Sequence, residues 1–257
     1  MLLAVDVGNT HTVLGLFDGE RLCCDWRMQT NRNITSDELA ARLEGLFHLK
    51  KQSLTTVSGV IIGSVAPPLG STWSNMAGLY LGCEALQVKG KNLDTGVAVI
   101  TDNPDEVGAD RIINAAAGFA RYRQPLIIVD FGTAITLDCV SAAGEYIGGA
   151  IAPGLGISFD ALIQRTAKLP RIDFTIAPEK PIGTNTAMAL RAGLLYGFAG
   201  LVEGLVRRMV EQFAPLTPKV IATGGMAGVI APYAPSIEAV EPLLTLEGLR
   251  LIHARNC

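Results

Sequence analysis

The sequence lacks any concentration of positive charge. Among its 257 residues, 21 are Lys or Arg and 24 are Asp or Glu, which leaves a formal net charge of −3. No run of Lys or Arg is longer than two residues, as at Lys50-Lys51 and Arg207-Arg208. The basic footprint that attracts a phosphate backbone is therefore missing, and we expect no nucleic acid among the partners.

Cysteines are few and long apolar runs are missing. The five cysteines are odd in number and include no Cys-x-x-Cys pair, which is typical of reduced thiols in the cytoplasm. The richest apolar segment, 192–206, is interrupted by glycines and Glu203, so no uninterrupted stretch reaches the roughly 18 residues of a membrane-spanning helix. The opening residues lack the basic start and long apolar core of a signal peptide. These absences predict a cytoplasmic protein without a membrane partner.

Two common nucleotide-binding motifs are missing as well. The chain contains neither G-x-x-x-x-G-K-[ST] nor G-x-G-x-x-G after a strand, which excludes a P-loop enzyme and a dinucleotide fingerprint. The three histidines, His11, His48 and His253, are scattered and give no metal-ligand spacing. Any phosphate chemistry must therefore come from another arrangement.

Residues 1–17 predict a hairpin whose turn can hold a phosphate. Leu2–Val5 is a short apolar strand that ends in Asp6, a small polar turn from Gly8 to Thr10 follows, and a second strand begins near Val13. Gly8 lets the backbone approach an anion closely, and Asp6 can hold Mg²⁺ directly or through water. An ordinary hairpin with an Asn-containing turn has the same pattern, so this stretch alone leaves both interpretations open.

A second copy of the pattern lies about half the chain further on. The aligned pairs, first copy before second, are Asp6 and Asp130, Gly8 and Gly132, Asn9 and Thr133, and Thr12 and Thr136. Each copy is followed by a Gly-Glu turn and a further strand. Two copies are too few for a solenoid and instead predict two similar α/β domains, 1–115 and 116–257, which face each other across a cleft.

The rest of the pattern adds strands and helices to each hairpin. Thr35 and Glu38 form a capping box before a helix with an apolar face. The expected strands are 21–28, 57–65, 84–88, 145–151, 219–222 and 238–240, and the expected helices begin near residues 36, 67, 110, 157, 186 and 246. Glycines at 148–156 predict a third close backbone approach. Thr223-Gly224-Gly225 is either an adenosine-side turn or a plain strand-to-helix turn.

The segment Gly108-Ala109-Asp110-Arg111 offers acceptor chemistry. A carboxylate can take the proton from a hydroxyl held about 3 Å away, and a guanidinium binds a carboxylate through a bidentate fork. Asp110 would then be the base and Arg111 would orient the acceptor. The same residues also suit a helix N-terminus followed by a surface Arg, and spacing alone leaves both interpretations open.

Taken in order, these motifs resemble the type III pantothenate kinases of the actin, sugar kinase and heat-shock ATPase superfamily. The matching segments are 6–10 (Asp-Val-Gly-Asn-Thr), 108–111, 129–134, 148–154 and 183–186, and the resemblance extends beyond residue 225. It implies two actin-like (ribonuclease H-like) domains with ATP in the cleft between them. It also implies ATP-dependent phosphorylation of pantothenate to 4′-phosphopantothenate, the first step of coenzyme A biosynthesis.

The resemblance also implies a role for each matching residue. The residues implied to bind ATP are Asp6, Val7, Gly8, Asn9, Thr10, His11, Thr12, Val13 and Thr133. The residues implied to bind pantothenate are Gly108, Ala109, Asp110, Arg111 and Thr186, with Asp110 as the catalytic base. Mg²⁺ would lie near Asp6, bound through phosphate or water, and Asp130 would ligate K⁺ or NH₄⁺. The family is homodimeric, and the partner subunit helps to close the substrate pocket.

Two other interpretations keep the fold and change the function. The chain could be an ATP-binding accessory or actin-like regulatory protein, or a kinase of another small hydroxy or carboxylic acid. The segment 108–111 separates them, because an actin-like structural protein needs no acceptor base beside a guanidinium. One departure from the family is Thr101, which stands where many members have an aromatic residue, so no substrate contact is carried over to that position.

Overall fold

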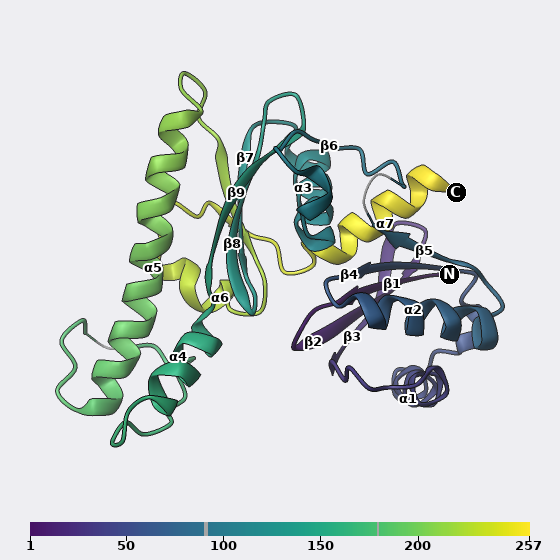
Figure 1. Ribbon diagram of the computed structural model, residues 1–257, viewed down its shortest axis with the longest axis horizontal. Coiled ribbons are helices and arrows are strands. Elements are labelled where there is room, and N and C mark those ends of the chain that lie inside the picture. The colour runs from purple at the N-terminus through teal and green to yellow at the C-terminus, as the bar shows by residue number, and fades with distance from the viewer. Residues whose placement is uncertain (90–91, 179) are drawn as a thin grey trace. The chain divides into compact units, whose positions relative to one another are not determined.

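The computed structural model describes residues 1–89, 92–178 and 180–257, which form two compact units (Figure 1). Unit 1 comprises Met1–Arg121 and Leu243–Cys257, and unit 2 comprises Tyr122–Pro242. The boundary expected after residue 115 falls inside helix α3 (Ala109–Tyr122). The division therefore differs from the expected one at both ends of unit 2.

Unit 1 is built on a five-stranded mixed sheet with the order β3-β2-β1-β4-β5. Its strands are β1 (Leu2–Val7), β2 (His11–Asp18), β3 (Arg21–Gln29), β4 (Gly59–Ser64) and β5 (Ala85–Val88). The first three strands are antiparallel neighbours, whereas β4 runs parallel to both β1 and β5. The central strand β1 is apolar almost throughout because it is buried between layers of the unit.

Helices cover both faces of this sheet (Figure 1). The helical elements of unit 1 are α1 (Ser36–Leu49), η1 (Leu54–Thr56), α2 (Pro67–Met76), η2 (Ala77–Leu81), η3 (Pro104–Glu106), α3 and α7 (Leu244–Asn256), and a short strand, β6, spans Ala98–Val99. The predicted capping box is confirmed, since the Thr35 hydroxyl accepts from the Glu38 N–H and the Glu38 carboxylate accepts from the Thr35 N–H. These bonds from Thr35 lower the pKa of the Glu38 carboxyl.

Helix α7 was expected in the second domain but belongs to unit 1, where it packs against β1 and β4. Leu249 and Ile252 are fully buried there, so apolar contacts fix the helix in this unit regardless of its place in the sequence. Burial also lowers the pKa of His253 on the same helix.

Unit 2 repeats the same topology. Its strands are β7 (Leu126–Phe131), β8 (Ala134–Val140), β9 (Glu145–Pro153), β10 (Lys219–Thr223) and β11 (Ala239–Val240). They follow the order β11-β10-β7-β8-β9, which matches β5-β4-β1-β2-β3 in unit 1. The strand directions match as well, because β7, β8 and β9 are antiparallel neighbours and β10 is parallel to β7 and β11. The predicted internal repeat is therefore confirmed.

The repeat is out of register by one residue in its second strand. Asp6 pairs with Val13, whereas Asp130 pairs with Thr136. Thr136 is therefore the counterpart of Val13, and the expected pairing of Thr136 with Thr12 is wrong. The cause is the turn, which is one residue longer in the first hairpin. An alignment of the two hairpins without a gap is therefore correct only up to Gly8 and Gly132.

Unit 2 contains one long helix. Its helical elements are α4 (Leu155–Gln164), α5 (Thr186–Gln212), α6 (Ala227–Ile230) and η4 (Ala231–Tyr233). Among the described residues, α5 has the length and the apolar composition of a helix that could cross a membrane. The sequence had not predicted this, because no uninterrupted apolar run of that length lies within the helix. Its residues Leu195 and Val202 are fully buried in one cluster with Ile127 of β7, which is the packing of a core helix.

Candidate active site

The first group of site residues forms the β1–β2 turn of unit 1. Asp6 lies near the end of β1, and the Gly8 N–H closes the turn by donating to His11 O at 3.1 Å. A Cβ atom at Gly8 would lie 2.8 Å from that same oxygen, so a side chain would force the turn open. Asn9, Thr10 and His11 are exposed, so a ligand can reach the tip of the turn.

Thr30, which the sequence did not point to, holds this turn from the loop after β3. Its N–H donates to Thr10 O at 3.0 Å, and its hydroxyl donates to Gly8 O at 2.8 Å. The Thr12 hydroxyl lies 3.0 Å from the Thr30 hydroxyl and donates to it, because the only hydroxyl proton of Thr30 is directed to Gly8. Thr12 is almost completely buried, so its side chain supports the turn from inside.

The segment 108–111 forms the start of α3. Gly108 O accepts from the N–H groups of Arg111 at 3.1 Å and Ile112 at 3.3 Å, and Asp110 Oδ1 accepts from Arg111 N at 2.9 Å. A Cβ atom at Gly108 would lie 2.6 Å from Asp110 Oδ1. The glycine therefore makes room for the carboxylate. Both proposed roles of Asp110 are compatible, since a carboxylate at a helix N-terminus can also face an acceptor.

The second group of site residues surrounds the β7–β8 turn of unit 2. Asp130 near the end of β7 lies beside Thr223 at the end of the parallel strand β10. Gly224 follows at φ 92°, and a Cβ atom there would overlap Asp130 Oδ1 and the Phe131 backbone. The strand-to-helix turn 223–225 is therefore packed directly on the acid of the second hairpin.

A further glycine approaches this turn from β9. Gly154 N–H donates to Thr133 O at 3.1 Å, and a Cβ atom at Gly154 would overlap the same carbonyl. The close backbone approach predicted for residues 148–156 is confirmed at this residue. Gly132 and Thr133 are exposed at the tip of the turn.

Comparison with known proteins identifies the family. The family model described as type III pantothenate kinase matches residues 2–208. A protein of Geobacter sulfurreducens named type III pantothenate kinase is 52% identical over 256 residues, which cover 100% of this chain and 99% of that protein. The chain belongs to the type III pantothenate kinase family. A relative of the same name from Desulfatibacillum aliphaticivorans is 48% identical over 255 residues, 99% of this chain and 98% of its own.

Solved structures confirm the fold expected for this kinase. A conserved putative Baf family transcriptional activator from Campylobacter jejuni matches with a TM-score of 0.61 at 19% identity and covers 98% of this chain and 97% of its own. Component A of (R)-2-hydroxyglutaryl-CoA dehydratase from Acidaminococcus fermentans has a TM-score of 0.56 at 13% identity, with 98% and 95% covered. At these identities the likeness shows the fold alone, which is the α/β actin-like (ribonuclease H-like) class with two similar units.

The kinase has a buried carboxylate, Asp138, on strand β8 behind its second turn. The sequence alone did not point to this residue. Asp138 is fully buried and accepts from the Thr136 hydroxyl and the Tyr146 hydroxyl, both at 2.8 Å. Thr136 is the cross-strand partner of Asp130, so these groups share one face of the sheet. An acid in an otherwise apolar strand was the signal that could have pointed to this network.

Thr186 of the kinase is the first residue of α5 and is exposed. Asn185 caps the helix by accepting from Met188 N at 2.9 Å, and the helix begins near residue 186, where the sequence predicts its start. A Cβ atom at Gly183 would overlap the Ala189 backbone, so the preceding loop packs tightly on the first helical turn. The N-terminal end of this long helix favours negative charge.

Thr101, the position at which the sequence suggested a departure from the family, has a buried hydroxyl. Its Oγ1 has no hydrogen-bond partner in the part of the chain that the structure describes. The preceding residue, Ile100, has an exposed side chain. A buried hydroxyl and an exposed apolar side chain are therefore neighbours in the chain here.

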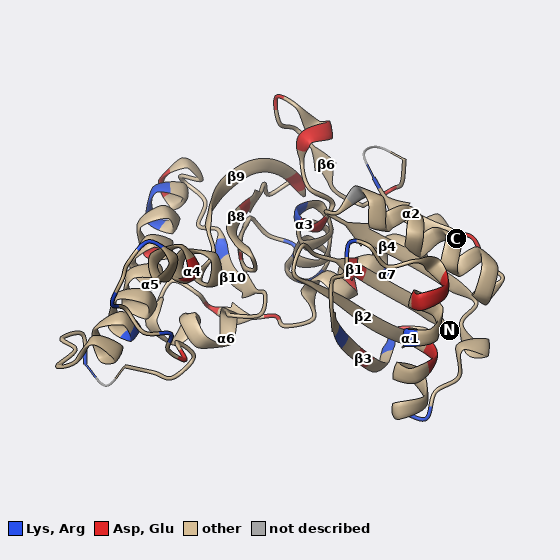
Figure 2. Ribbon diagram, turned by 60° about the horizontal axis from the view of Figure 1, so that its bottom comes forward, with Lys and Arg blue, Asp and Glu red and all other residues tan. Residues whose placement is uncertain are grey.

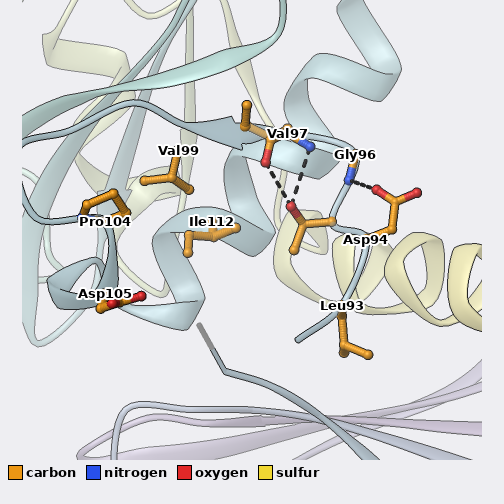
Figure 3. Close-up of a pocket in the computed structure, with 10 residues that line it drawn as sticks. Leu93, Asp94, Gly96, Val97, Val99, Pro104, Asp105 and Ile112 are labelled. Carbon is orange, nitrogen blue, oxygen red and sulfur yellow. Dashed lines mark hydrogen bonds between the residues drawn. The ribbon is translucent and has the colours of Figure 1, made fainter. Parts of the chain in front are cut away.

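A cavity of about 470 Å³ in unit 1 lies beside α3 (Figure 3). Val99, Pro104 and Ile112 contribute its apolar wall. Among the described residues that line it, the charged ones are Asp94, which pairs with Arg255 at 3.4 Å, and Asp105, and Asp110 is not among them. Because neither Asp110 nor Arg111 lines it, we do not assign the acceptor to this cavity.

Proposed function

We propose that this chain transfers the γ-phosphoryl group of ATP to the hydroxyl of pantothenate, giving 4′-phosphopantothenate in the first step of coenzyme A biosynthesis. The observation that carries this proposal is the start of α3, where Gly108 makes room for the Asp110 carboxylate beside Arg111. Membership of the type III pantothenate kinase family over most of the chain names the acceptor.

The chemistry follows from positioning and charge, because phosphoryl transfer needs little covalent help. Asp110 takes the proton of the pantothenate hydroxyl while that oxygen attacks the γ-phosphorus and ADP leaves. Arg111 binds the acceptor through its guanidinium fork, and Thr186 contacts the acceptor at the N-terminal end of α5.

We assign the ATP phosphates to residues 6–13 and a further ATP contact to Thr133. The tip of the turn, Asn9 to His11, is exposed and can present backbone N–H groups to an anion, whereas Val7 and Thr12 are buried. The Asp6 carboxylate is a hard oxygen ligand that fits Mg²⁺. The described residues contain no group of three metal-binding side chains, so Mg²⁺ would be held by Asp6 together with phosphate and water. Bound Mg²⁺ would neutralise phosphate charge.

For Asp130 we propose a monovalent cation, K⁺ or NH₄⁺. Its Oδ1 atom lies close to Gly132 and Gly224, and carboxylate oxygens suit a hard cation. A bound cation would neutralise this carboxylate so that it does not repel ATP.

We therefore expect the Asp130→Asn variant to lose its dependence on K⁺ while it keeps some turnover. The amide removes the negative charge that the cation is proposed to neutralise. Initial rates across a K⁺ titration at constant ionic strength, with tetramethylammonium as the replacement ion, measure this. A K⁺ dependence equal to that of the wild type would contradict the assignment of the cation site to Asp130.

We also propose a cytoplasmic homodimer, in which the partner subunit helps to close the substrate pocket. This rests on the family resemblance. Basic and acidic residues are interspersed along the ribbon, and no described element is uniformly basic (Figure 2). This distribution suits a small-molecule enzyme better than a nucleic-acid-binding protein. Light scattering after size exclusion is expected to give twice the mass of the chain.

A coupled ADP-release assay tests the reaction and the acceptor together. With ATP, Mg²⁺ and K⁺, we expect ADP release only after pantothenate is added. ADP is released when the phosphoryl group is transferred, and this transfer needs an acceptor hydroxyl from which Asp110 takes the proton. The alternatives give different results. Release without an acceptor would favour an ATPase of the accessory or regulatory kind, and turnover with another hydroxy acid but not with pantothenate would change the substrate.

A further inference from the structure

The loop after β3 places a guanidinium beside the first phosphate turn. Arg32 Nη2 donates to Asn9 Oδ1 at 3.0 Å, and both side chains are exposed. Two residues earlier, Thr30 bonds the carbonyls of Gly8 and Thr10 through its hydroxyl and its N–H. The backbone two residues before Arg32 is therefore bonded to the turn, which keeps the guanidinium within reach of it.

The first turn needs positive charge that its own hairpin does not provide. Residues 1–20 contain no Lys or Arg, and the charge nearest the turn in sequence is the carboxylate of Asp6. A nucleoside triphosphate brings several negative charges to such a turn, and charge shifts toward the leaving phosphate oxygens as the phosphoryl group is transferred. Fixed cationic donors stabilise that charge better than solvent does.

We propose that Arg32 is a further nucleotide-binding residue, whose guanidinium binds phosphate oxygens of ATP at the β1–β2 turn. The inference rests on the proposed function only in taking ATP as the ligand. A guanidinium has five N–H donors in a planar fork, so one edge can stay on Asn9 while another binds phosphate. Asn9 then has a second role, because its side-chain oxygen orients Arg32 toward the turn.

A purely structural role for Arg32 would give a different result from phosphate binding. If the residue only ties down Asn9, then glutamine, which can still donate to Asn9 Oδ1, should preserve most of its effect. If it binds phosphate, the charge matters, and lysine should preserve more of the effect than glutamine. The two variants therefore separate the two roles.

We expect Arg32→Gln to weaken ATP binding about 10- to 100-fold, the effect of one lost charge-assisted contact. Arg32→Lys should fall between this variant and the wild type. The control is Arg27→Gln, which removes the same charge from an exposed position on β3. Calorimetric ATP titrations without pantothenate give the Kd, and a repeat with ADP identifies whether the terminal phosphate is contacted.

Three readouts decide the proposal. Support requires a raised Kd for ATP in Arg32→Gln, an unchanged unfolding temperature, and a weaker salt dependence of binding than in Arg27→Gln. Equal Kd values for Arg32→Gln and Arg27→Gln would overturn it. Because ATP binding is measured without an acceptor, a failure of pantothenate turnover in the wild type refutes the proposed function separately from the role of Arg32.

Discussion

We expect the Asp110→Asn variant to show a kcat about 10²–10⁴-fold lower and nearly intact ATP binding. The amide occupies the same space beside Gly108 and can still accept from Arg111 N, so the start of α3 is preserved. What it loses is the ability to take the proton of the acceptor hydroxyl. Steady-state kinetics with pantothenate and calorimetric titration with ATP measure the two effects separately.

The matched control for this variant is Asp105→Asn. Asp105 is an exposed acid five residues earlier, in the short turn η3, and the structure places it on the cavity rather than in the motif. Removing the Asp105 carboxylate should leave kcat within about twofold of the wild-type value, because a substitution of an exposed residue outside the motif usually has a small effect. A near-normal kcat for Asp110→Asn would rule out the base role and return the motif to its plain helix-start interpretation.

Replacing Gly224 with Ala should both destabilise the protein and abolish most of its activity. The residue has φ 92°, a backbone conformation that costs an L-residue about 1–2 kcal/mol. Its new Cβ atom would also overlap Asp130 Oδ1 and the Phe131 backbone, and β7 cannot shift cheaply because it is the central strand of unit 2. We expect a loss of roughly 2–4 kcal/mol in the free energy of unfolding, measured by urea denaturation.

Gly228→Ala provides the comparison. Gly228 lies in α6 with open space around the position of a Cβ atom, so alanine there should be neutral or slightly stabilising. The close packing of Gly224 would be contradicted if both alanine variants unfolded at the same urea concentration with full activity.

Patterns within one stretch of chain made most of the fold predictable. The two hairpins follow from an apolar run that ends in Asp6 or Asp130 and a glycine two residues later. The capping box at Thr35 is equally local, and both α1 and α5 begin at the residues expected from the sequence. Local hydrogen bonding decides such features, so neighbouring residues contain the information.

Features that depend on contacts distant in sequence could not be predicted. The placement of α7 depends on which apolar face Leu249 and Ile252 meet, and chain order does not show this. The support of Gly8 by Thr30 joins residues 22 positions apart, and the packing of Gly224 on Asp130 joins two strands that are separated by a long segment. The single-residue difference between the two turns is also invisible in a gap-free alignment.

The return of α7 to unit 1 makes unit 2 a domain insertion. Residues Tyr122–Pro242 are contiguous, whereas unit 1 needs both Met1–Arg121 and Leu243–Cys257. During synthesis, unit 2 can therefore leave the ribosome whole before unit 1 has received the helix that completes its core. All five strands of the unit 1 sheet precede unit 2 in the chain, so what this sheet lacks until the end of synthesis is one of its covering helices.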